Sequence, residues 1–347
     1  MSESLPTVDA ILKSNEIEYY YTERYGHATM PEPAELWLWC QLDEGNVISK
    51  HFVHFPHASQ ALIPCWSWFQ KIKRARNNHL PASVTRAHTH CGFYLKDGLG
   101  DFVRPKKWIS QLIRHMGCTI TVSEPKTGIS TGNCTRKGAP NCTAIHETLV
   151  YRLPFDDYYK MKYFDRPDDA AALRTKILQS VHFADTLRTS TARIAIVDRK
   201  RTRRILNLQS MVASLEAAFP NAMIETGYME DMTPREQFVF WSQHDIIVTG
   251  HGAAMTNAIF LPPGNASAVV ELFPPHYYPA YFFSNLLTSA GIRGYGYFNG
   301  VADYIADHAE HSKTLEDRDL YRNQDLEPRV DAVLDLVRQA MLDGGFL

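Results

Sequence analysis

Two clusters in the second half of the chain have residue types and spacings that suit phosphate binding. One is the run Thr249-Gly250-His251-Gly252-Ala253, in which two glycines allow the backbone to turn tightly and to approach a ligand. A helix beginning near Ala253 would point unpaired N–H groups and the positive end of its dipole at the same place. His251 could donate a hydrogen bond to a phosphate oxygen there. A plain strand-to-helix connection would show the same two glycines.

The second cluster is basic. Five cations occupy the six positions from 199 to 204, in the sequence RKRTRR, directly after Asp198. Arginine suits a diphosphate because its planar guanidinium offers paired donors. A solvated basic loop and a nucleic-acid contact are the alternatives for such a run. The formal net charge of −2 argues against duplex nucleic acid as the main partner.

The elements around these clusters alternate between two types. Short β-branched runs bounded by polar residues predict strands at 193–197, 222–225, 245–248 and 268–272. Apolar residues at helical spacing predict a helix at 205–219. A second helix is expected from Pro234 to about residue 244, with Thr233 and Glu236 as a capping box. Such alternation indicates a parallel, Rossmann-like sheet, and both clusters then lie at its carboxyl edge, where these sheets bind ligands.

The first half also mixes short apolar runs with helical stretches. Its pattern predicts strands at 35–42 and 119–122, helices at 105–116 and from about 167, and a loop at 126–144 that is rich in Gly, Thr and Asn. The expected fold is therefore α/β in two domains. We place an N-terminal α/β domain at 1–188, a Rossmann-like domain at 189–325, and an amphipathic C-terminal helix that packs on the body at 326–347.

Histidines gather in the first half, and they are candidates for acid–base chemistry because histidine titrates near neutrality. His54 and His57 form one pair, and His88 and His90 form another. The second pair is followed by Cys91, but no further pair of ligands stands at a spacing typical of zinc sites. The second half has no Asp-x-Asp motif. No metal is expected.

The amino-acid composition limits the classes of protein to which the chain can belong. Apolar residues form 45% of the chain and charged residues 21%, which predicts a globular protein. The sequence has no apolar run long enough to span a membrane, and Met1–Asn15 lacks the features of a signal peptide. As written, the chain is expected to be soluble and cytoplasmic. Six cysteines at irregular spacings do not imply a disulfide framework, although Cys134 and Cys142 could pair.

The second half closely resembles glycosyltransferase family 61. The resemblance rests on five segments: Arg199–Asn207, Glu236–Gln237, Asp245–Phe260 (DIIVTGHGAAMTNAIF), Pro263–Gly264 and Val269–Pro274 (VVELFP). In the first half, His51–Pro64 is similar to the His-Phe segment of the family. That family includes the plant core β-1,2-xylosyltransferase, xylan arabinosyl- and xylosyltransferases, and animal O-linked N-acetylglucosaminyltransferases that act on extracellular substrates.

The resemblance implies a GT-B fold, with two Rossmann-like domains facing a cleft, the donor in the C-terminal domain and the acceptor in the cleft. It implies an inverting, metal-independent transfer from a nucleotide-sugar donor, UDP-linked, to a glycan or glycoprotein hydroxyl. The sugar would be of the xylose, N-acetylglucosamine or arabinose type. The matching donor-binding positions are Arg199, Arg203, His251, Gly252, Ala253, Asn257 and Glu271, the last of which could bind the ribose hydroxyls or sit in a local ion pair.

The catalytic base is expected in the first half, at His54 or His57. Members of the family commonly carry a carboxylate shortly after the His-Phe segment, where this chain has His57, Ala58 and Ser59. A catalytically inactive nucleotide- or glycan-binding protein of the same fold is therefore the main alternative. A nicotinamide oxidoreductase is excluded, because arginines follow the first strand where that class has Gly-x-Gly-x-x-Gly. Eukaryotic relatives work in the endoplasmic reticulum or Golgi lumen.

Overall fold

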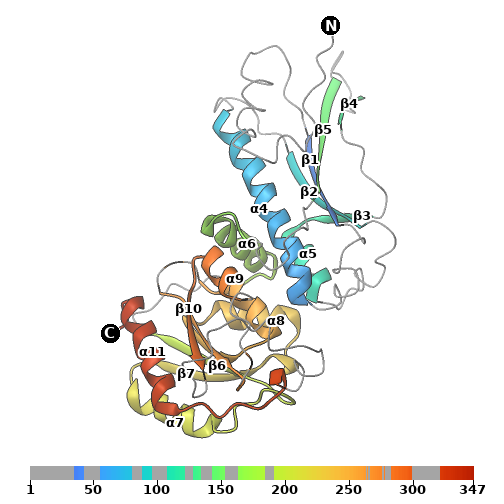
Figure 1. Ribbon diagram of the computed structural model, residues 1–347. Coiled ribbons are helices and arrows are strands. Elements are labelled where there is room, and N and C mark those ends of the chain that lie inside the picture. The colour runs from blue at the N-terminus through green and yellow to red at the C-terminus, as the bar shows by residue number, and fades with distance from the viewer. Residues whose placement is uncertain are drawn as a thin grey trace. The chain divides into compact units, whose positions relative to one another are not determined.

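The computed structural model describes residues 35–42, 55–79, 88–95, 108–121, 128–133, 143–152, 163–183, 191–262, 264, 266–275, 277, 283–298 and 321–347. The chain divides into two compact units, residues 1–156 and residues 157–347. Each unit has its own mainly parallel sheet (Figure 1). The α/β class expected from the alternating pattern is confirmed.

The first unit contains a five-stranded sheet in the order β3-β2-β1-β5-β4. Its elements are β1 (Glu35–Leu42), α4 (Phe55–His79), β2 (His88–Leu95), α5 (Trp108–Met116), β3 (Thr119–Thr121), β4 (Gly128–Asn133) and β5 (Thr143–Arg152). β1 pairs in parallel with β2 and β5, β2 pairs in parallel with β3, and only β4 among the described strands runs antiparallel. The apolar faces of α4 and α5 are buried within this unit.

Two disulfides fasten the first unit, which corrects the expectation that the cysteines form no framework. Cys40 of β1 is bonded to Cys65 of α4, and Cys91 of β2 is bonded to Cys118, just before β3. The partners are 25 and 27 residues apart in sequence. The sequence did not reveal these two disulfides, because the cysteines are brought together by helix-on-sheet packing and by strand pairing, which the local sequence does not specify. The suggested pair of Cys134 and Cys142 lies outside the described residues.

The second unit contains a five-stranded, fully parallel sheet in the order β10-β9-β8-β6-β7. Its strands are β6 (Arg193–Asp198), β7 (Met223–Tyr228), β8 (Ile246–Gly250), β9 (Ala268–Phe273) and β10 (Arg293–Phe298). Its helices are α6 (Pro167–Ser180), α7 (Leu208–Ala218), η1 (Met229–Asp231), α8 (Pro234–Ser242), η2 (Ala253–Phe260), α9 (Ser284–Ser289) and α11 (Val330–Gly344). The parallel sheet predicted for this half is confirmed.

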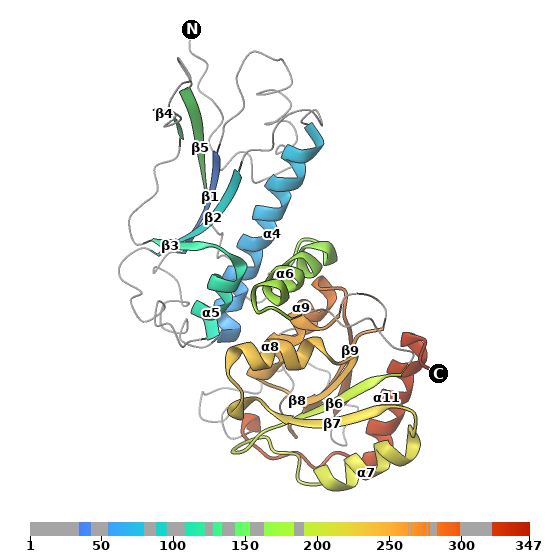
Figure 2. The same cartoon turned by 180° about the vertical axis from the view of Figure 1, so that it is seen from behind.

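Helices cover both faces of the second sheet (Figure 2). On one face, α7 and α11 pack over alternate residues of the central strands, such as Ile196 of β6, Val248 of β8 and Val270 of β9, all fully buried. On the other face, η2 contacts α6, α8 and α9. The predicted capping box at the start of α8 is present, because Thr233 Oγ1 accepts from Glu236 N while Glu236 accepts from Thr233 N. Local signals therefore fix this helix where the sequence predicts it.

Several features differ from the sequence-based expectations, and β2, α4, β5 and α9 were not predicted. The loop predicted at 126–144 is wrong over β4, a Gly- and Thr-rich strand that is recognisable only through its pairing with β5. β10 was not predicted, because its Gly-rich sequence RGYGYF carries a weak strand signal. α6, assigned above to the first domain, lies in the second unit. Its buried Arg174 donates from Nε to the carbonyl of Phe260 at the end of η2, at 2.9 Å.

Candidate anion-binding site

The basic run and the glycine turn follow two neighbouring strands in the middle of the second sheet. β6 and β8 pair in parallel, with Val197 opposite Thr249. After β6 the chain goes to β7 on one side, whereas after β8 it goes to β9 on the other. The two connections leave in opposite directions, and the carboxyl ends of the strands at such a reversal form the usual ligand crevice of this architecture. The structure thus brings both predicted clusters to one place.

The turn after β8 directs backbone donors at this crevice. His251 N donates to Leu272 O at 2.8 Å, which fixes the turn to β9, and Gly252 O accepts from Met255 N at 3.0 Å as η2 begins. Within the described part of the chain, no acceptor pairs with the N–H groups of Gly252, Ala253 and Ala254. Such N–H groups, together with the helix dipole, favour an anion. The helix predicted to begin at Ala253 is present as a 3₁₀ helix.

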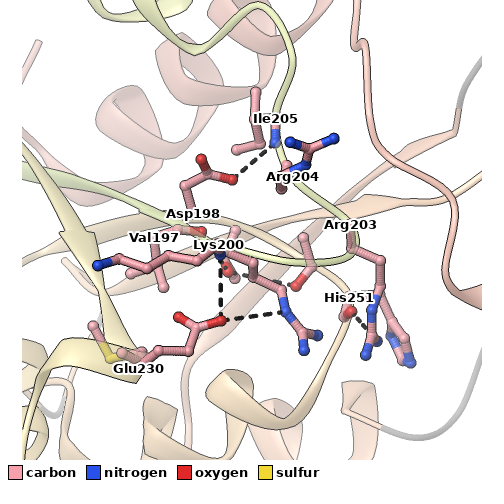
Figure 3. A network of polar contacts seen from close by, with 12 residues as sticks. Val197, Asp198, Lys200, Arg203, Arg204, Ile205, Glu230 and His251 are labelled. Carbon is pink, nitrogen blue, oxygen red and sulfur yellow. Dashed lines mark hydrogen bonds and ion pairs between the residues drawn. The ribbon is translucent and has the colours of Figure 1, made fainter.

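Two arginines of the basic run converge on the glycine of this turn. A Cβ added to Gly252 would lie 2.8 Å from Arg199 Nη1 and 2.9 Å from Arg203 Nη1. Arg203 Nη1 also donates to the carbonyl oxygen of His251 at 2.6 Å, and Figure 3 shows these two residues side by side. Only glycine therefore leaves room for both guanidinium groups against the backbone. The pair presents its donors where the N–H groups of η2 begin.

The two guanidinium groups are partly withdrawn from water. Burial lowers the pKa of Arg199 below its usual range. Burial and then the nearby charges of Arg199 and Arg322 lower the pKa of Arg203 to about 10, so Arg203 stays protonated near neutrality. Its buried Nε has no hydrogen-bond partner among the described residues. Cations that repel one another in a half-buried place are stabilised when an anion binds between them.

The other cations of the basic run face elsewhere. Lys200 Nζ donates to Asp231 Oδ1 at 2.6 Å, and the guanidinium of Arg204 binds Asp325 with two nitrogens. Arg201 is exposed. Of the five predicted cations, Arg199 and Arg203 are thus the two that the structure brings to the turn.

Two carboxylates hold the loop that carries these arginines. Asp198 Oδ1 accepts from Ile205 N at 2.8 Å and closes the loop, and burial raises the pKa of Asp198. Glu230 Oε1, on η1, lies 3.9 Å from Arg199 Nε and accepts from Lys200 N at 3.4 Å (Figure 3). Arg203 itself has a positive φ of 60°, an uncommon backbone conformation for a residue other than glycine. The loop is therefore held in one shape by contacts from outside it.

His251 and Glu271 form a buried pair behind the turn. The Nδ1–H of His251 donates to Glu271 Oε1 at 2.6 Å, and the two residues are only 5% and 7% exposed. The rings of Phe273, Tyr277 and Phe283 surround the imidazole at centroid distances of 5.5, 5.6 and 5.3 Å. This pair orients the imidazole in the way that a carboxylate orients a catalytic or metal-binding histidine. Glu271 thus makes a local hydrogen bond to His251, and its binding of ribose hydroxyls stays a prediction.

Asn257 and Ala253 complete the expected donor-side residues. Ala253 is the first residue of η2 and is half-buried. Asn257 is fully buried, and its amide nitrogen donates to Gln237 Oε1 on α8 at 3.1 Å and to Ala254 O at 3.2 Å. These contacts fix η2 against α8. Asn257 therefore supports the helix from inside.

The histidines expected to supply a base lie in the first unit. His54 falls outside the described residues, and His57 belongs to α4 with its side chain outside them. His88 and His90 both belong to β2, and the His90 ring stacks on Trp37 with centroids 4.4 Å apart. Among the side chains that the structure describes, no three His, Cys, Asp or Glu residues are grouped to hold a metal ion.

Two residues whose charges act on this arginine pair were missed by sequence reasoning. Glu230 lies 31 residues after Arg199, and Arg322 lies beyond the last predicted strand of the sheet. No motif marks either residue. The acidic residues after β7 were a usable signal for Glu230, because β7 neighbours β6 and ends at the same edge.

The chain matches the model of a protein family described as Glycosyltransferase 61 over residues 55–270, which is more than half of its length. The matched range includes the basic run and the glycine turn, and it ends just before Glu271. No curated protein matches the chain. None of the helices in the described ranges is long and apolar enough to cross a membrane.

Proposed function

Because the chain belongs to glycosyltransferase family 61, we propose that it transfers a sugar from a nucleoside diphosphate donor to a hydroxyl group of a glycan or protein. The donor is UDP-linked and its sugar is of the xylose, N-acetylglucosamine or arabinose type. Transfer inverts the anomeric carbon and requires no metal ion. The two units act as the two Rossmann-like domains of a GT-B enzyme, with the donor in the second.

One observation carries this proposal: the guanidinium groups of Arg199 and Arg203 meet over Gly252, at the start of a helix and at the strand reversal of the sheet. A diphosphate fits this arrangement, because paired arginine donors and backbone N–H groups both recognise phosphate oxygens. The fixed positive charge also supports a metal-independent reaction, since it performs the role that a divalent cation performs in other phosphate sites.

In the proposed reaction the acceptor oxygen attacks the anomeric carbon while the bond from that carbon to the β-phosphate oxygen breaks. The electron pair of the broken bond passes to the departing diphosphate, and the acceptor proton passes to a base. Arg199, Arg203 and the N–H groups of η2 stabilise the developing negative charge. Removal of one such preorganised donor lowers the rate by about 10²–10³ in other enzymes.

The buried pair of His251 and Glu271 has a positioning role in this scheme. The carbonyl of His251 accepts from Arg203 Nη1, while its ring is fixed by Glu271. The pair therefore fixes the position of Arg203 relative to the turn. The base comes from the first unit, at His54 or His57, as the similarity of His51–Pro64 to the family segment suggests.

We further propose that the protein folds in an oxidising compartment. The bonds Cys40–Cys65 and Cys91–Cys118 support this, since structural disulfides are rare in reducing compartments. The secretory lumen in which eukaryotic members of the family work fits that requirement.

Thermal-shift titration with UDP, GDP and CMP and their sugars, without metal and again with EDTA, tests the donor assignment. A ligand at about 100 times its Kd should stabilise the protein by about 2.7 kcal/mol. The shift is expected with one nucleotide, unchanged by EDTA and lost in Arg203→Ala. Arg338→Ala is the matched control, because this exposed arginine of α11 pairs with Asp335 away from the turn.

Transfer of the sugar from the selected donor to glycan acceptors then tests catalysis. Binding without transfer or hydrolysis would favour the inactive binding protein over the enzyme. If no nucleotide or nucleotide-sugar changes the Tm of the protein, the proposed donor site is wrong.

A further inference from the structure

One carboxylate lies beside the arginine pair at the carboxyl edge of the second sheet. Glu230 belongs to η1, directly after the edge strand β7. Because β7 pairs in parallel with β6, Glu230 and Arg199 leave the sheet at the same edge. Glu230 Oε1 lies 3.9 Å from Arg199 Nε, and Nη1 of the same guanidinium lies against Gly252. A single guanidinium group therefore connects this carboxylate to the glycine turn.

The contacts that Glu230 makes within the described part of the chain are long. Its Oε1 accepts from Lys200 N at 3.4 Å and lies 3.9 Å from Arg199 Nε, whereas N–H···O bonds usually span about 2.7–3.2 Å (Figure 3). Its Oε2 makes no hydrogen bond to the residues of the described ranges. The neighbouring Asp231, by contrast, binds Lys200 Nζ at 2.6 Å. An ionised carboxylate accepts about four hydrogen bonds, so Glu230, with 40% of its side chain exposed, retains capacity for a ligand.

The loop that carries the arginine pair is held more firmly by a segment near the C-terminus. Leu326 N donates to Arg204 O at 2.7 Å, and a parallel bridge joins Leu326 to Ile205. The segment Tyr321–Leu326 is thus paired with the loop by bonds that are shorter than those of Glu230. The shape of the loop therefore depends less on Glu230 than on this segment.

A carboxylate at this place opposes the binding of a phosphate group, because like charges repel one another. It suits a neighbouring part of the ligand that donates hydrogen bonds, and a sugar hydroxyl is such a donor. Parallel sheets that bind dinucleotides combine the same two features. In those sheets a helix N-terminus binds the pyrophosphate, and an acidic residue further along the chain binds the ribose.

We propose that Glu230 binds hydroxyl groups of a sugar ring attached to the diphosphate, and so selects a nucleotide over a bare polyphosphate. This inference rests on the proposed function and adds a specificity-determining residue to its donor site. The ring is the ribose, as in the dinucleotide-binding sheets, or the transferred sugar, since both carry hydroxyls next to the diphosphate. Glu271, for which the family resemblance implies the ribose role, is only 7% exposed and is hydrogen-bonded to His251.

Calorimetric titrations of Glu230→Gln with pyrophosphate, UDP and UDP-sugars separate hydroxyl binding from support of Arg199. Pyrophosphate has no sugar ring, so its Kd is expected to stay the same or to fall when the negative charge is removed. The Kd of a ligand whose ring Glu230 binds should rise by about 10-fold, as for the loss of a hydrogen bond to a charged group. The Tm of each variant without ligand verifies folding.

Two comparisons identify the ring. If Glu230 binds the ribose, the wild type prefers UDP to 2′-deoxy-UDP, and Glu230→Gln loses that preference. If it binds the transferred sugar, the variant retains the preference and loses affinity only for UDP-xylose or UDP-N-acetylglucosamine. Asp231→Asn is the matched control, because it removes the same charge from the next residue, whose carboxylate binds Lys200 instead.

Three results would overturn the role of Glu230 and leave the proposed function standing. Equal losses for pyrophosphate and UDP in Glu230→Gln would show that the residue acts only through Arg199. Unchanged affinities for all of these ligands would remove it from the site. Loss of the preference for UDP over 2′-deoxy-UDP in Glu271→Gln, with the affinities of Glu230→Gln unchanged, would assign the ribose to Glu271. A wild-type protein that binds neither pyrophosphate nor any nucleoside diphosphate would overturn the proposed function as well.

Discussion

Replacement of Gly252 by alanine is expected to weaken donor binding while leaving the fold nearly unchanged. The new Cβ would lie 2.8 Å from Arg199 Nη1 and 2.9 Å from Arg203 Nη1, whereas ordinary van der Waals contact begins at 3.4 Å. Each guanidinium must therefore move by about 0.5–0.6 Å to clear the methyl group. Both movements lead away from the turn.

The expected loss of affinity follows from the length of a hydrogen bond. N–H···O bonds span about 2.7–3.2 Å, so a shift of that size moves a donor to the limit of useful contact. A hydrogen bond to a charged group contributes about 1.5–3 kcal/mol. Loss of one such bond corresponds to an increase of about 10- to 150-fold in the Kd of the donor.

Stability should change little in Gly252→Ala. The groups that must move are the ends of long, flexible side chains, and the backbone of Gly252, at φ 160° and ψ −175°, is an extended conformation that alanine also adopts. Gly294→Ala is the control, since its Cβ would approach only Leu287 Cδ1, at 3.0 Å, within the described neighbourhood. Donor affinity is measured by calorimetric titration, and folding by the Tm. Wild-type affinity in a folded Gly252→Ala protein would refute the placement of the diphosphate between the arginines and the turn.

Three further predictions concern stability. Burial lowers the pKa of His244 below its usual value of 6.5. Just below pH 6.5 the folded state therefore binds fewer protons than the unfolded state, and the free energy of unfolding should rise with pH in this window. His244→Gln should flatten this rise in urea titrations between pH 5 and 7 (roughly the window in which histidine titrates), and an unaltered slope would contradict the assignment. Paired replacement of Cys40 and Cys65 by alanine should destabilise the first unit by about 3 kcal/mol, because the bond closes a loop of 25 residues; an unchanged first-unit Tm would speak against the bond. Thr233→Ala should remove the capping box of α8 and lower stability by about 1 kcal/mol, or about 2–4 °C in the Tm of the second unit, while Thr233→Ser retains it; equal losses in both variants would exclude capping as the cause.

Much of the second unit could be predicted because its signals are local. The β-branched strand runs, the helical spacing of α7 and the capping box at Thr233 each lie within a few residues. Strand alternation then placed the basic run and the glycine turn at one edge of the sheet. The structure agrees because parallel β-α units leave few other arrangements.

The detailed assignment of the site could not be predicted, because it depends on partners that are distant in sequence. Which cations of the basic run reach the turn is decided by Asp231 and Asp325, which hold Lys200 and Arg204 elsewhere. The hydrogen bond between His251 and Glu271 joins residues of two strand ends that are 20 residues apart. Neither the composition of the chain nor the periodicity of its apolar residues predicts such pairings between distant side chains.

The first unit illustrates the same limit for the fold. The strand β4 was read as a loop because its Gly- and Thr-rich sequence gains stability from the ladder with β5. The two disulfides were missed because each joins segments that meet only after the sheet and its helices have formed. The spacing of cysteines predicts disulfides when a domain is small and its contacts are local. The contacts that join these cysteines are not local.

The parallel bridge between Ile205 and Leu326 has a consequence for synthesis on the ribosome. Arg204 meets Asp325 across 121 residues, so all the strands of the second sheet are synthesised before the segment that pairs with the loop carrying Arg199 and Arg203. A nascent chain ending before Tyr321 therefore contains every strand of this sheet but lacks the segment that pairs with the loop. The loop therefore receives its contact with Leu326 only after all the strands of the sheet that carries it have been synthesised.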